Sequence, residues 1–260
     1  MKYKIRKIFI SVVVLVLLSG CSAPEPEFTP PPDRESLIPE SQVKITGDMD
    51  VYPVTSETNE YDDPVPLPYP VNTAGAEDSA FIMPDGKTLY VWFTPDVNTP
   101  IELQVVDGVT GIYVYHQENG SWIGPERVIL QDLGKVALDG CEFVLGDTMW
   151  FCSAREGYTG LHWFTADFAD GSWQSWQLAD FESDYQVGEL HISTDGSELY
   201  FHSSRPGGVG DIDLWVSNLI NGEWGEPKNI TVVNSPHPDG WPFLSQDGME
   251  LWFTRVIGAP

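Results

Sequence analysis

The stretch that decides the fold is residues 188–230, which read GELHISTDGSELYFHSSRPGGVGDIDLWVSNLINGEWGEPKNI. Four short runs rich in β-branched and aromatic residues are separated by turn-forming residues. Asp195-Gly196 and Asn221-Gly222 are dipeptides typical of two-residue hairpin turns, and residues 204–210 form a loop rich in Gly. The pattern predicts a four-stranded antiparallel meander. Such a sheet cannot bury both of its faces alone, so we expect it to recur.

The pattern does recur along the chain. A Gly-x-Trp tripeptide stands at 120–122, 171–173 and 222–224, at a constant interval of 51 residues. The first hairpin returns at 81–90, 143–150 and 243–252. We therefore predict three complete repeats, at 77–128, 139–178 and 187–230. A fourth begins at Asp239 and holds one hairpin.

Folding each hairpin at its turn predicts which residues face each other. The predicted pairs are Phe81/Tyr90, Phe143/Trp150, His191/Tyr200 and Phe243/Trp252, with Ile82/Leu89, Val144/Met149, Ile192/Leu199 and Leu244/Leu251 beside them on the other face. Cross-strand aromatic pairs stabilise a sheet by roughly 0.2–1 kcal/mol each. Because both faces are apolar, each sheet should lie between two others. The predicted fold class is all-β, a β-propeller of four-stranded antiparallel blades.

Residues 193–217, STDGSELYFHSSRPGGVGDIDLWVS, closely resemble the WD-repeat-like propeller repeats of TolB-type bacterial envelope proteins. The resemblance extends over about residues 77–255 and is loosest in the second repeat. It implies a propeller in the cell envelope. It says little about function, because the same repeat serves many binding roles.

The N-terminus has the pattern of a secretory signal. Four basic residues lie within 1–7, an apolar run covers 8–18, and Leu18-Ser19-Gly20-Cys21 follows. This order is typical of a signal peptide, and the apolar run is shorter than the roughly 20 residues of a membrane-spanning helix. The last four residues resemble a lipobox, which predicts cleavage after residue 20 and lipidation of Cys21. An ordinary signal with an incidental Cys is the alternative. Ser22, by resemblance to the sorting rule for lipoproteins, favours the outer membrane if the source has two membranes.

Residues 21–70 are rich in Pro and acids and are predicted to be an extended linker that packs in no core. Residues 71–260 are the predicted propeller, with almost no helix. The incomplete fourth repeat has two explanations. The chain is a fragment, which we favour because residues 255–260 read like the middle of a loop, or residues 43–54 form strands that complete the last sheet.

The charge limits the kinds of partner. Without residues 1–20 the chain keeps nine basic against 39 acidic residues, a net charge of −30. Such a charge argues against binding nucleic acid or anionic lipid surfaces. The five His residues show no metal-binding spacing, and no motif implies a cofactor. For residues 205–213, a hydrogen-bonded Gly-rich turn is favoured over a Ca²⁺ loop.

Propeller geometry predicts where binding residues gather. The loop that enters each innermost strand and the loop after the second strand open on one face. The entry positions carry Glu77/Asp78, Asp139/Glu142, Glu189 and Asp239, and the second loops carry Asp96, Arg155, Arg205 and Arg255. The predicted binding set is Asp139, Glu189, Asp239, Arg155, Arg205 and Trp241. The structural alternative is that each acid and each Arg ties down its own loop.

The sequence also predicts a disulfide and a function. Folding the second repeat at residues 146–147 sets Cys141 opposite Cys152, and directly opposed strand residues are close enough for a disulfide in an oxidising compartment. The function predicted is a lipid-anchored envelope propeller that binds or scaffolds a protein or glycan. The alternative is a glycosidase-like hydrolase that uses the carboxylates at the channel mouth.

Overall fold

Four antiparallel sheets follow one another along the chain in a computed structural model, which describes residues 33–49, 60–179, 181 and 187–258. Blade 1 contains β1 (Ala76–Ile82), β2 (Thr88–Thr94), β3 (Gly111–Glu118) and β4 (Ser121–Arg127). Blade 2 contains β5 (Ala137–Leu145), β6 (Thr148–Arg155), β7 (His162–Ala169) and β8 (Ser172–Leu178). Blade 3 contains β9 (Val187–Ile192), β10 (Glu198–Ser203), β11 (Asp213–Ile220), β12 (Glu223–Trp224) and β13 (Lys228–Asn229). Blade 4 contains β14 (Asp239–Leu244) and β15 (Leu251–Arg255).

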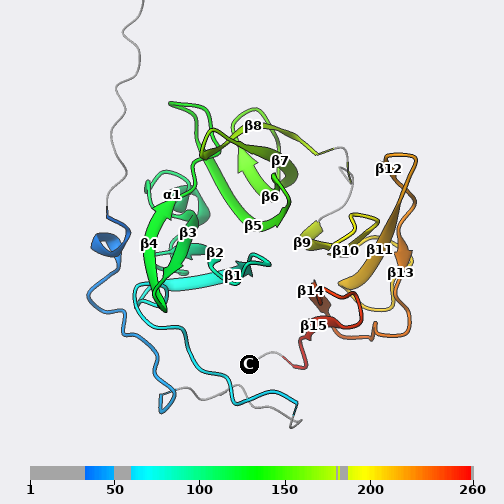
Figure 1. The fold of residues 1–260 in the computed structure, drawn as a ribbon, viewed down its shortest axis with the longest axis horizontal. Helices are drawn as coiled ribbons and strands as arrows, with labels where there is room; N and C mark the ends of the chain where they lie inside the picture. Colours follow the sequence, from blue (N-terminus) through cyan, green and yellow to red (C-terminus); the bar gives the residue numbers. More distant parts are fainter. Residues whose placement is uncertain (1–32, 50–59, 180, 182–186, 259–260) are drawn as a thin grey trace, which may run out of the picture.

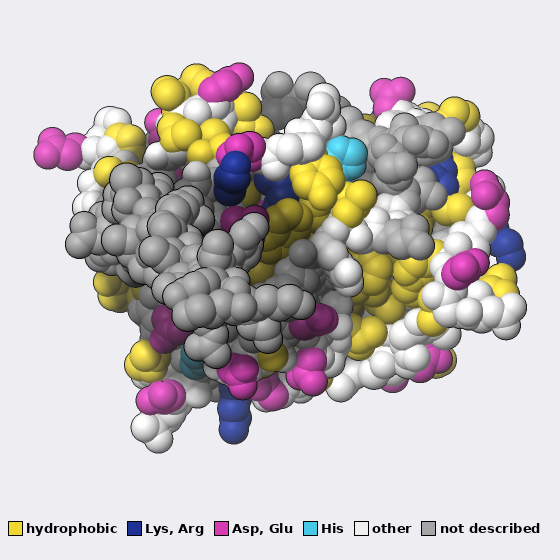
Figure 2. Space-filling model, turned by 90° about the horizontal axis from the view of Figure 1, so that it is seen from above, with side chains coloured by type: hydrophobic (Ala, Val, Ile, Leu, Met, Phe, Trp, Pro, Cys, Tyr) yellow, Lys and Arg dark blue, Asp and Glu magenta, His cyan; other side chains and the backbone are white. Residues whose placement is uncertain are grey.

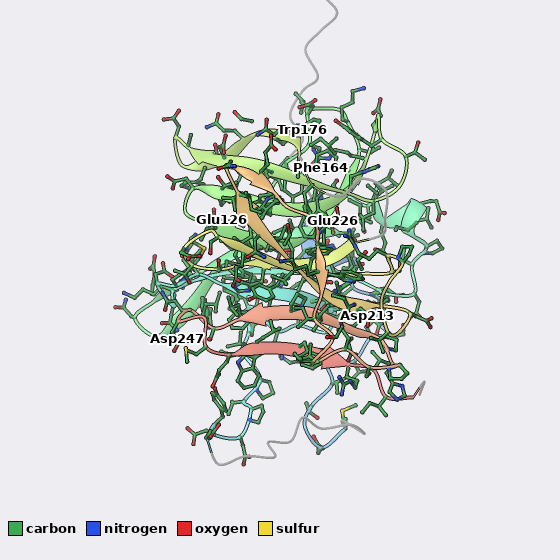
Figure 3. The ribbon with its side chains drawn as sticks, turned by 90° about the vertical axis from the view of Figure 1, so that its right-hand side faces the viewer. Glu126, Phe164, Trp176, Asp213, Glu226 and Asp247 are labelled. Atoms are coloured by element: carbon green, nitrogen blue, oxygen red, sulfur yellow. The ribbon has the colours of Figure 1, made fainter. Side chains whose placement is uncertain are left out.

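The sheets are arranged as the blades of a propeller, with the first strand of each blade innermost (Figure 1). Each complete blade runs outward in chain order, with β12 and β13 sharing the outer edge of blade 3. The prediction of an all-β propeller with three complete blades and part of a fourth is confirmed. Figure 3 shows Asp247, in the β14–β15 turn, and Asp213, at the start of β11, on opposite sides of the ring.

The hairpin register agrees with the sequence prediction. Phe81 lies opposite Tyr90, Phe143 opposite Trp150, His191 opposite Tyr200 and Phe243 opposite Trp252, and the four neighbouring apolar pairs also match. The outer turns agree as well. Asn119, Asp170 and Asn221 have φ of 52°, 52° and 54°, and each precedes a Gly with positive φ. Two left-handed residues in a row are what a type I′ hairpin turn requires.

The predicted opposition of Cys141 and Cys152 is wrong. A bulge lies between Gly140 and Phe143, so Gly140 is the residue opposite Cys152. Cys141 occupies the bulge with φ of 55°. Both cysteines are free thiols in the structure. A hydrogen bond to Cys152, together with burial, raises the pKa of the Cys141 thiol.

The apolar faces of the blades pack as expected from their residues. One core cluster joins blades 2 and 3 through Phe143, Trp163 and Phe201, and another joins blades 1 and 2. A third covers the remaining face of blade 1, where Ile38 of the predicted linker packs against the cluster. The expectation that the linker packs in no core therefore fails for its described residues 34–38.

Arg34 explains why this part of the linker is held. Asp33 caps a short 3₁₀ helix, Arg34–Leu37, and the Arg34 side chain is buried. Its guanidinium lies 4.3 Å from the centre of the Phe93 ring, its Nη2 donates to the carbonyl of Pro70 at 2.8 Å, and Nη2 lies 3.8 Å from Glu77 Oε1. A buried cation over an aromatic face is worth about 2 kcal/mol or more.

Helical structure in the described residues is limited to this 3₁₀ turn and α1 (Ile101–Gln104), as predicted. Residues 43–49 contain no strand, and residues 50–54 lie outside the described residues. The described part of the linker nevertheless reaches blade 4, because Tyr61 packs edge-on against Trp252 with ring centres 5.1 Å apart. Among the helices described, none has the length and apolar character needed to cross a membrane.

Candidate functional site

A small cavity of about 150 Å³ lies where the innermost strands meet. Three consecutive residues from each of these strands line it: 79–81, 141–143, 189–191 and 241–243. The four triplets are equivalent in the repeats. Each one ends at the residue that lies opposite an aromatic residue of the second strand, namely Phe81, Phe143, His191 or Phe243. The repeat itself therefore brings twelve side chains from four blades to one place.

Bulges in the innermost strands aim some of these side chains. Ser79, Cys141 and Trp241 stand at the same position of their blades and have φ of 50°, 55° and 56°. Positive φ is unfavourable for a bulky residue, yet blade 4 has Trp where blades 1 and 2 have Ser and Cys. The backbone N–H of Trp241 donates to His202 Nδ1 at 3.0 Å, and this hydrogen bond fixes the bulge. Trp241 itself stays 40% exposed. The strain therefore presents a large indole at the cavity.

Glu142 is the most unusual residue of the cavity. Its side chain is buried, with 4% of the residue exposed, and neither carboxyl oxygen has a hydrogen-bond partner among the described residues. Burial raises the pKa of Glu142 well above its ordinary value, and the carboxylates of Asp78 and Glu189 raise it further. A buried carboxyl without a partner is costly, so this position is not explained by stability alone.

Glu189 links blades 1 and 3 at the same cavity. Its Oε1 accepts a hydrogen bond from Ser79 Oγ at 3.3 Å, and its Oε2 lies 3.7 Å from His202 Nε2. Burial raises the pKa of Glu189, and Asp78 adds to this effect. Burial also lowers the pKa of His202 to about 4, so the imidazole is neutral at pH 7 and the contact with Glu189 is not an ion pair there.

Glycine makes room for His202 between blades 3 and 4. A Cβ atom at Gly188 would overlap the imidazole, and one at Gly240 would lie 3.0 Å from Nδ1. The ring can therefore lie against the innermost strands of both blades, where it accepts the hydrogen bond from Trp241. His202 is thus a positioning residue for Trp241.

Asp139 and Arg155 do not face the cavity. Arg155 Nη2 donates to Asp139 Oδ1 at 2.7 Å inside blade 2, and both side chains are almost completely buried. Ser153 Oγ donates to the same oxygen at 2.6 Å. The guanidinium also lies 4.5 Å and 4.3 Å from the ring centres of Phe164 and Trp176, two side chains of blade 2 labelled in Figure 3. This pair ties one blade together.

Asp239 and Arg205 have similar positions in their own blades. Arg255 Nε donates to Asp239 Oδ1 at 2.6 Å in blade 4. Arg205 is buried with its guanidinium 5.1 Å from the ring centres of Phe201 and Trp215 in blade 3. Arg155 and Arg205 therefore each make their contacts within their own blade, and they do not bind one carboxylate together.

The structure thus divides the six predicted site residues into two groups. Glu189 and Trp241 line the central cavity, whereas Asp139, Arg155, Arg205 and Asp239 lie inside the blades. Glu142 stands at one of the predicted entry positions but was not among the six predicted site residues. One feature of the sequence distinguishes Glu142. It directly precedes Phe143 of the first hairpin, at a position where the other repeats have the apolar residues Ala80, Leu190 and Pro242.

Other polar features can be assigned without a ligand. The Gly-rich loop at 205–213 is a hydrogen-bonded turn, as predicted, because Val209 N and Gly210 N both donate to the Asp213 carboxylate. Within the described ranges, no group of three or more His, Cys, Asp or Glu residues is placed to hold a metal ion.

A larger hollow of about 520 Å³ lies between blades 1 and 2, on the side of the Asp-Gly turns. Trp173 and the exposed Phe168 line it from blade 2, and Tyr90 and Glu126 line it from blade 1. The Trp173 Nε1–H already donates to the Tyr90 hydroxyl at 3.3 Å. This hollow has no buried carboxylate comparable with Glu142, so we place the candidate site at the central cavity.

Glu142 should make the stability of the protein depend on pH. A carboxyl whose pKa is raised in the folded state contributes stability that is complete below its unfolded pKa and is lost as the pH rises through the folded pKa. We expect Glu142→Gln to remove this loss, so the variant should gain stability over the wild type as the pH rises. Urea unfolding from about pH 4 to about pH 8 measures it. Glu126→Gln, at an exposed glutamate, is the control; equal pH profiles for wild type and Glu142→Gln would refute the expectation.

Comparisons with known proteins give structural neighbours only. TolB from Acinetobacter baumannii matches with a TM-score of 0.43 and 18% identity over 70% of this chain and 38% of that one. A putative TolB from Agrobacterium tumefaciens matches with a TM-score of 0.42 and 18% identity, over 67% and 52%. A puromycin hydrolase S511A mutant complexed with PGG matches with a TM-score of 0.40 and 14% identity, over 73% and 30%.

This chain therefore corresponds to about half or less of the length of these neighbours. No protein-family model matches the chain. No curated protein matches it either. Proteins with such low identity can share a fold and differ in function, and the neighbours include both TolB proteins and a hydrolase.

Proposed function

We propose that this protein is a lipid-anchored β-propeller of the bacterial cell envelope that binds a partner, a protein or a glycan, at its central cavity. The observation that carries the proposal is the conformation and exposure of Trp241. A large, partly exposed indole stands in a strained backbone conformation where the equivalent residues are Ser79 and Cys141. Strained residues and exposed aromatic side chains are both typical of binding sites.

The glycosidase-like alternative has less support from the geometry. Asp139 and Asp239 are each held by an Arg within their own blades. Glu142 and Glu189 are the acid and base pair that this alternative would use. The two functions differ in one observable, because only a hydrolase releases reducing sugar from glycans of the envelope.

The test of the binding function uses Trp241→Ser, which installs the residue that blade 1 has at the equivalent position. We expect this variant to fold normally and to lose most capture of a partner from a detergent extract of the source envelope, because hot-spot aromatics dominate binding energy. Phe168→Ser is the matched control, since Phe168 is 44% exposed but lies in the hollow between blades 1 and 2. If Phe168→Ser loses capture and Trp241→Ser retains it, the site is at that hollow and our placement is wrong.

The lipid anchor rests on the N-terminal sequence, and Cys21 lies outside the described residues. We expect the wild type to incorporate a radiolabelled fatty acid and to fractionate with membranes, because a lipobox directs acylation of its Cys. The variant Cys21→Ala should do neither. Equal labelling of both proteins, or labelling of neither, would remove the anchor from the proposal.

A further inference from the structure

The buried carboxyl of Glu142 lacks a partner that it would normally have. Both of its oxygens are inaccessible to solvent and neither accepts a hydrogen bond from any described residue. Asp78 and Glu189 are near enough to raise its pKa, so the surrounding charge is also negative. Glu142 of blade 2 and Glu189 of blade 3 thus line a space to which no described Lys or Arg side chain contributes, and Asp78 of blade 1 adds negative charge that acts on both. A positive group from outside would stabilise this arrangement.

The walls of the cavity suit an organic cation. Phe81, Phe143, His191 and Phe243 come from the four innermost strands, and neighbouring ring centres are 5.0 Å, 4.6 Å and 4.8 Å apart along this series. Burial lowers the pKa of His191 to about 4, so its ring is neutral at pH 7 and does not repel a cation. Trp241 lines the same cavity. Aromatic cages of this kind recognise ammonium groups through their ring faces.

We propose that the central cavity binds an alkylammonium group, which forms a salt bridge with Glu189, is attracted by the charge of the buried Glu142 carboxylate, and is enclosed by the aromatic side chains of the innermost strands. This inference rests on the proposed binding function and specifies the chemistry of its ligand. The ammonium group belongs either to a lysine side chain of a protein partner or to a free amine.

The size of the cavity determines how much of a ligand enters. A drug-sized ligand needs a pocket of roughly 300–1,000 Å³, whereas a cavity of roughly 150 Å³ holds a molecule such as benzene. The central cavity, at about 150 Å³, therefore takes a group of a few heavy atoms and leaves the rest of the ligand at the mouth. The end of a lysine side chain or a short alkylamine has this size. The acidity of the whole chain, with net charge −26, favours the approach of a cation, and Figure 2 shows acidic side chains spread over one face.

Binding should be coupled to the proton on Glu142. The carboxyl groups that face it are those of Asp78 on β1 and Glu189 on β9, with Cys141 beside it on its own strand. Because Glu142 has a raised pKa, it must lose its proton before its charge can attract an ammonium group. The affinity should therefore increase as the pH rises through the raised pKa, and one proton should be released on binding.

The first experiment measures binding of n-butylammonium to the intact protein by calorimetry, with butan-1-ol as a neutral ligand of the same size. We expect n-butylammonium to bind and butan-1-ol not to bind. Glu142→Gln and Glu189→Gln should each weaken the binding at least about tenfold, a difference of 1.4 kcal/mol, and Glu126→Gln should leave it unchanged. Glu142→Gln keeps the shape of the side chain and removes the charge, so circular dichroism should show a normal fold. Equal affinity for the alcohol, or equal binding by wild type and Glu142→Gln, would overturn the proposal.

The second experiment distinguishes this inference from the binding function on which it rests. Small molecules are first removed from the envelope extract, the lysine residues of its proteins are acetylated, and the untreated small molecules are returned before capture. Loss of capture by the wild type supports a lysine as the ligand, whereas retained capture that is lost in Glu142→Gln supports a free amine. Capture that survives both acetylation and Glu142→Gln, but is lost in Trp241→Ser, overturns the ammonium proposal and leaves the binding function intact. Capture that also survives Trp241→Ser overturns both.

Discussion

Replacing Asp139 with Asn is expected to lower the free energy of unfolding by about 3–5 kcal/mol, because it leaves the charge of Arg155 buried without its counter-ion. Arg155 Nη2 and Asp139 Oδ1 are 2.7 Å apart, and their side chains are only 3% and 6% exposed. The Coulombic attraction between them is therefore weakly screened by solvent. Denaturant unfolding of wild type and variant measures the difference.

The matched control for this change is an ion pair at the surface. Lys135 Nζ and Glu156 Oε1 are 2.6 Å apart, but both side chains are about half exposed. Glu156→Gln should therefore have only a small effect. The double variant Asp139→Asn with Arg155→Met should recover part of the loss, because no buried charge remains. If Asp139→Asn costs no more than Glu156→Gln, the blade is not held together by this pair.

Replacing Arg34 with Ala is expected to lower the free energy of unfolding by about 2–3 kcal/mol, through loss of a buried cation–aromatic contact and a charged hydrogen bond. It should also release residues 33–49 from blade 1, because Arg34 is the buried side chain of the short helix there. Urea unfolding tests the stability, and limited proteolysis between residues 33 and 70 tests the release.

Arg34→Lys separates charge from shape. Lysine keeps the positive charge but lacks the planar guanidinium that lies over Phe93 and reaches the Pro70 carbonyl. We expect intermediate stability and intermediate protease resistance. An Arg34→Ala protein that is as stable and as resistant as the wild type would show that the N-terminal segment does not anchor to the propeller.

The sequence was sufficient to predict the blades because local turn chemistry sets the register. Asp-Gly and Asn-Gly turns fix which residues lie opposite each other, and the aromatic and apolar pairs then follow at a period of two. The bulges could not be predicted in this way. The bulge of β5 shifts Cys141 away from Cys152 but leaves the pairing of Phe143 with Trp150 unchanged. Cross-strand pairs counted from the turn are therefore predicted correctly up to the bulge and wrongly beyond it.

Arg34 was missed for a different reason. It lies in a segment whose composition is typical of a solvated linker, and no local pattern marks it as buried. Comparison of the repeats does indicate that blade 1 lacks a cation after its second strand. Arg155 and Arg205 stand at equivalent positions after the second strands of blades 2 and 3, whereas blade 1 has Pro95 there. The guanidinium of Arg34 lies between Glu77 and Phe93, so it supplies blade 1 with the cation that its own repeat lacks.

The candidate site was predicted only in part, because sequence cannot show which acids are paired. Asp139 and Glu189 are both entry-strand acids, but one is bound by an Arg of its own blade and the other lines the cavity. The choice depends on side-chain direction after a bulge. Glu142 was hidden for the same reason, since its burial without a hydrogen-bond partner is a property of the packed ring.

Site-specific photo-crosslinking shows whether a partner contacts the cavity at Trp241. The photoreactive residue p-benzoylphenylalanine is placed at position 241 in one protein and, as the matched control, at position 168 in another. Both are irradiated with an extract of the source envelope. We predict a discrete crosslinked species from position 241 and none from position 168. Crosslinking from position 168 alone, or from neither position, would contradict the account.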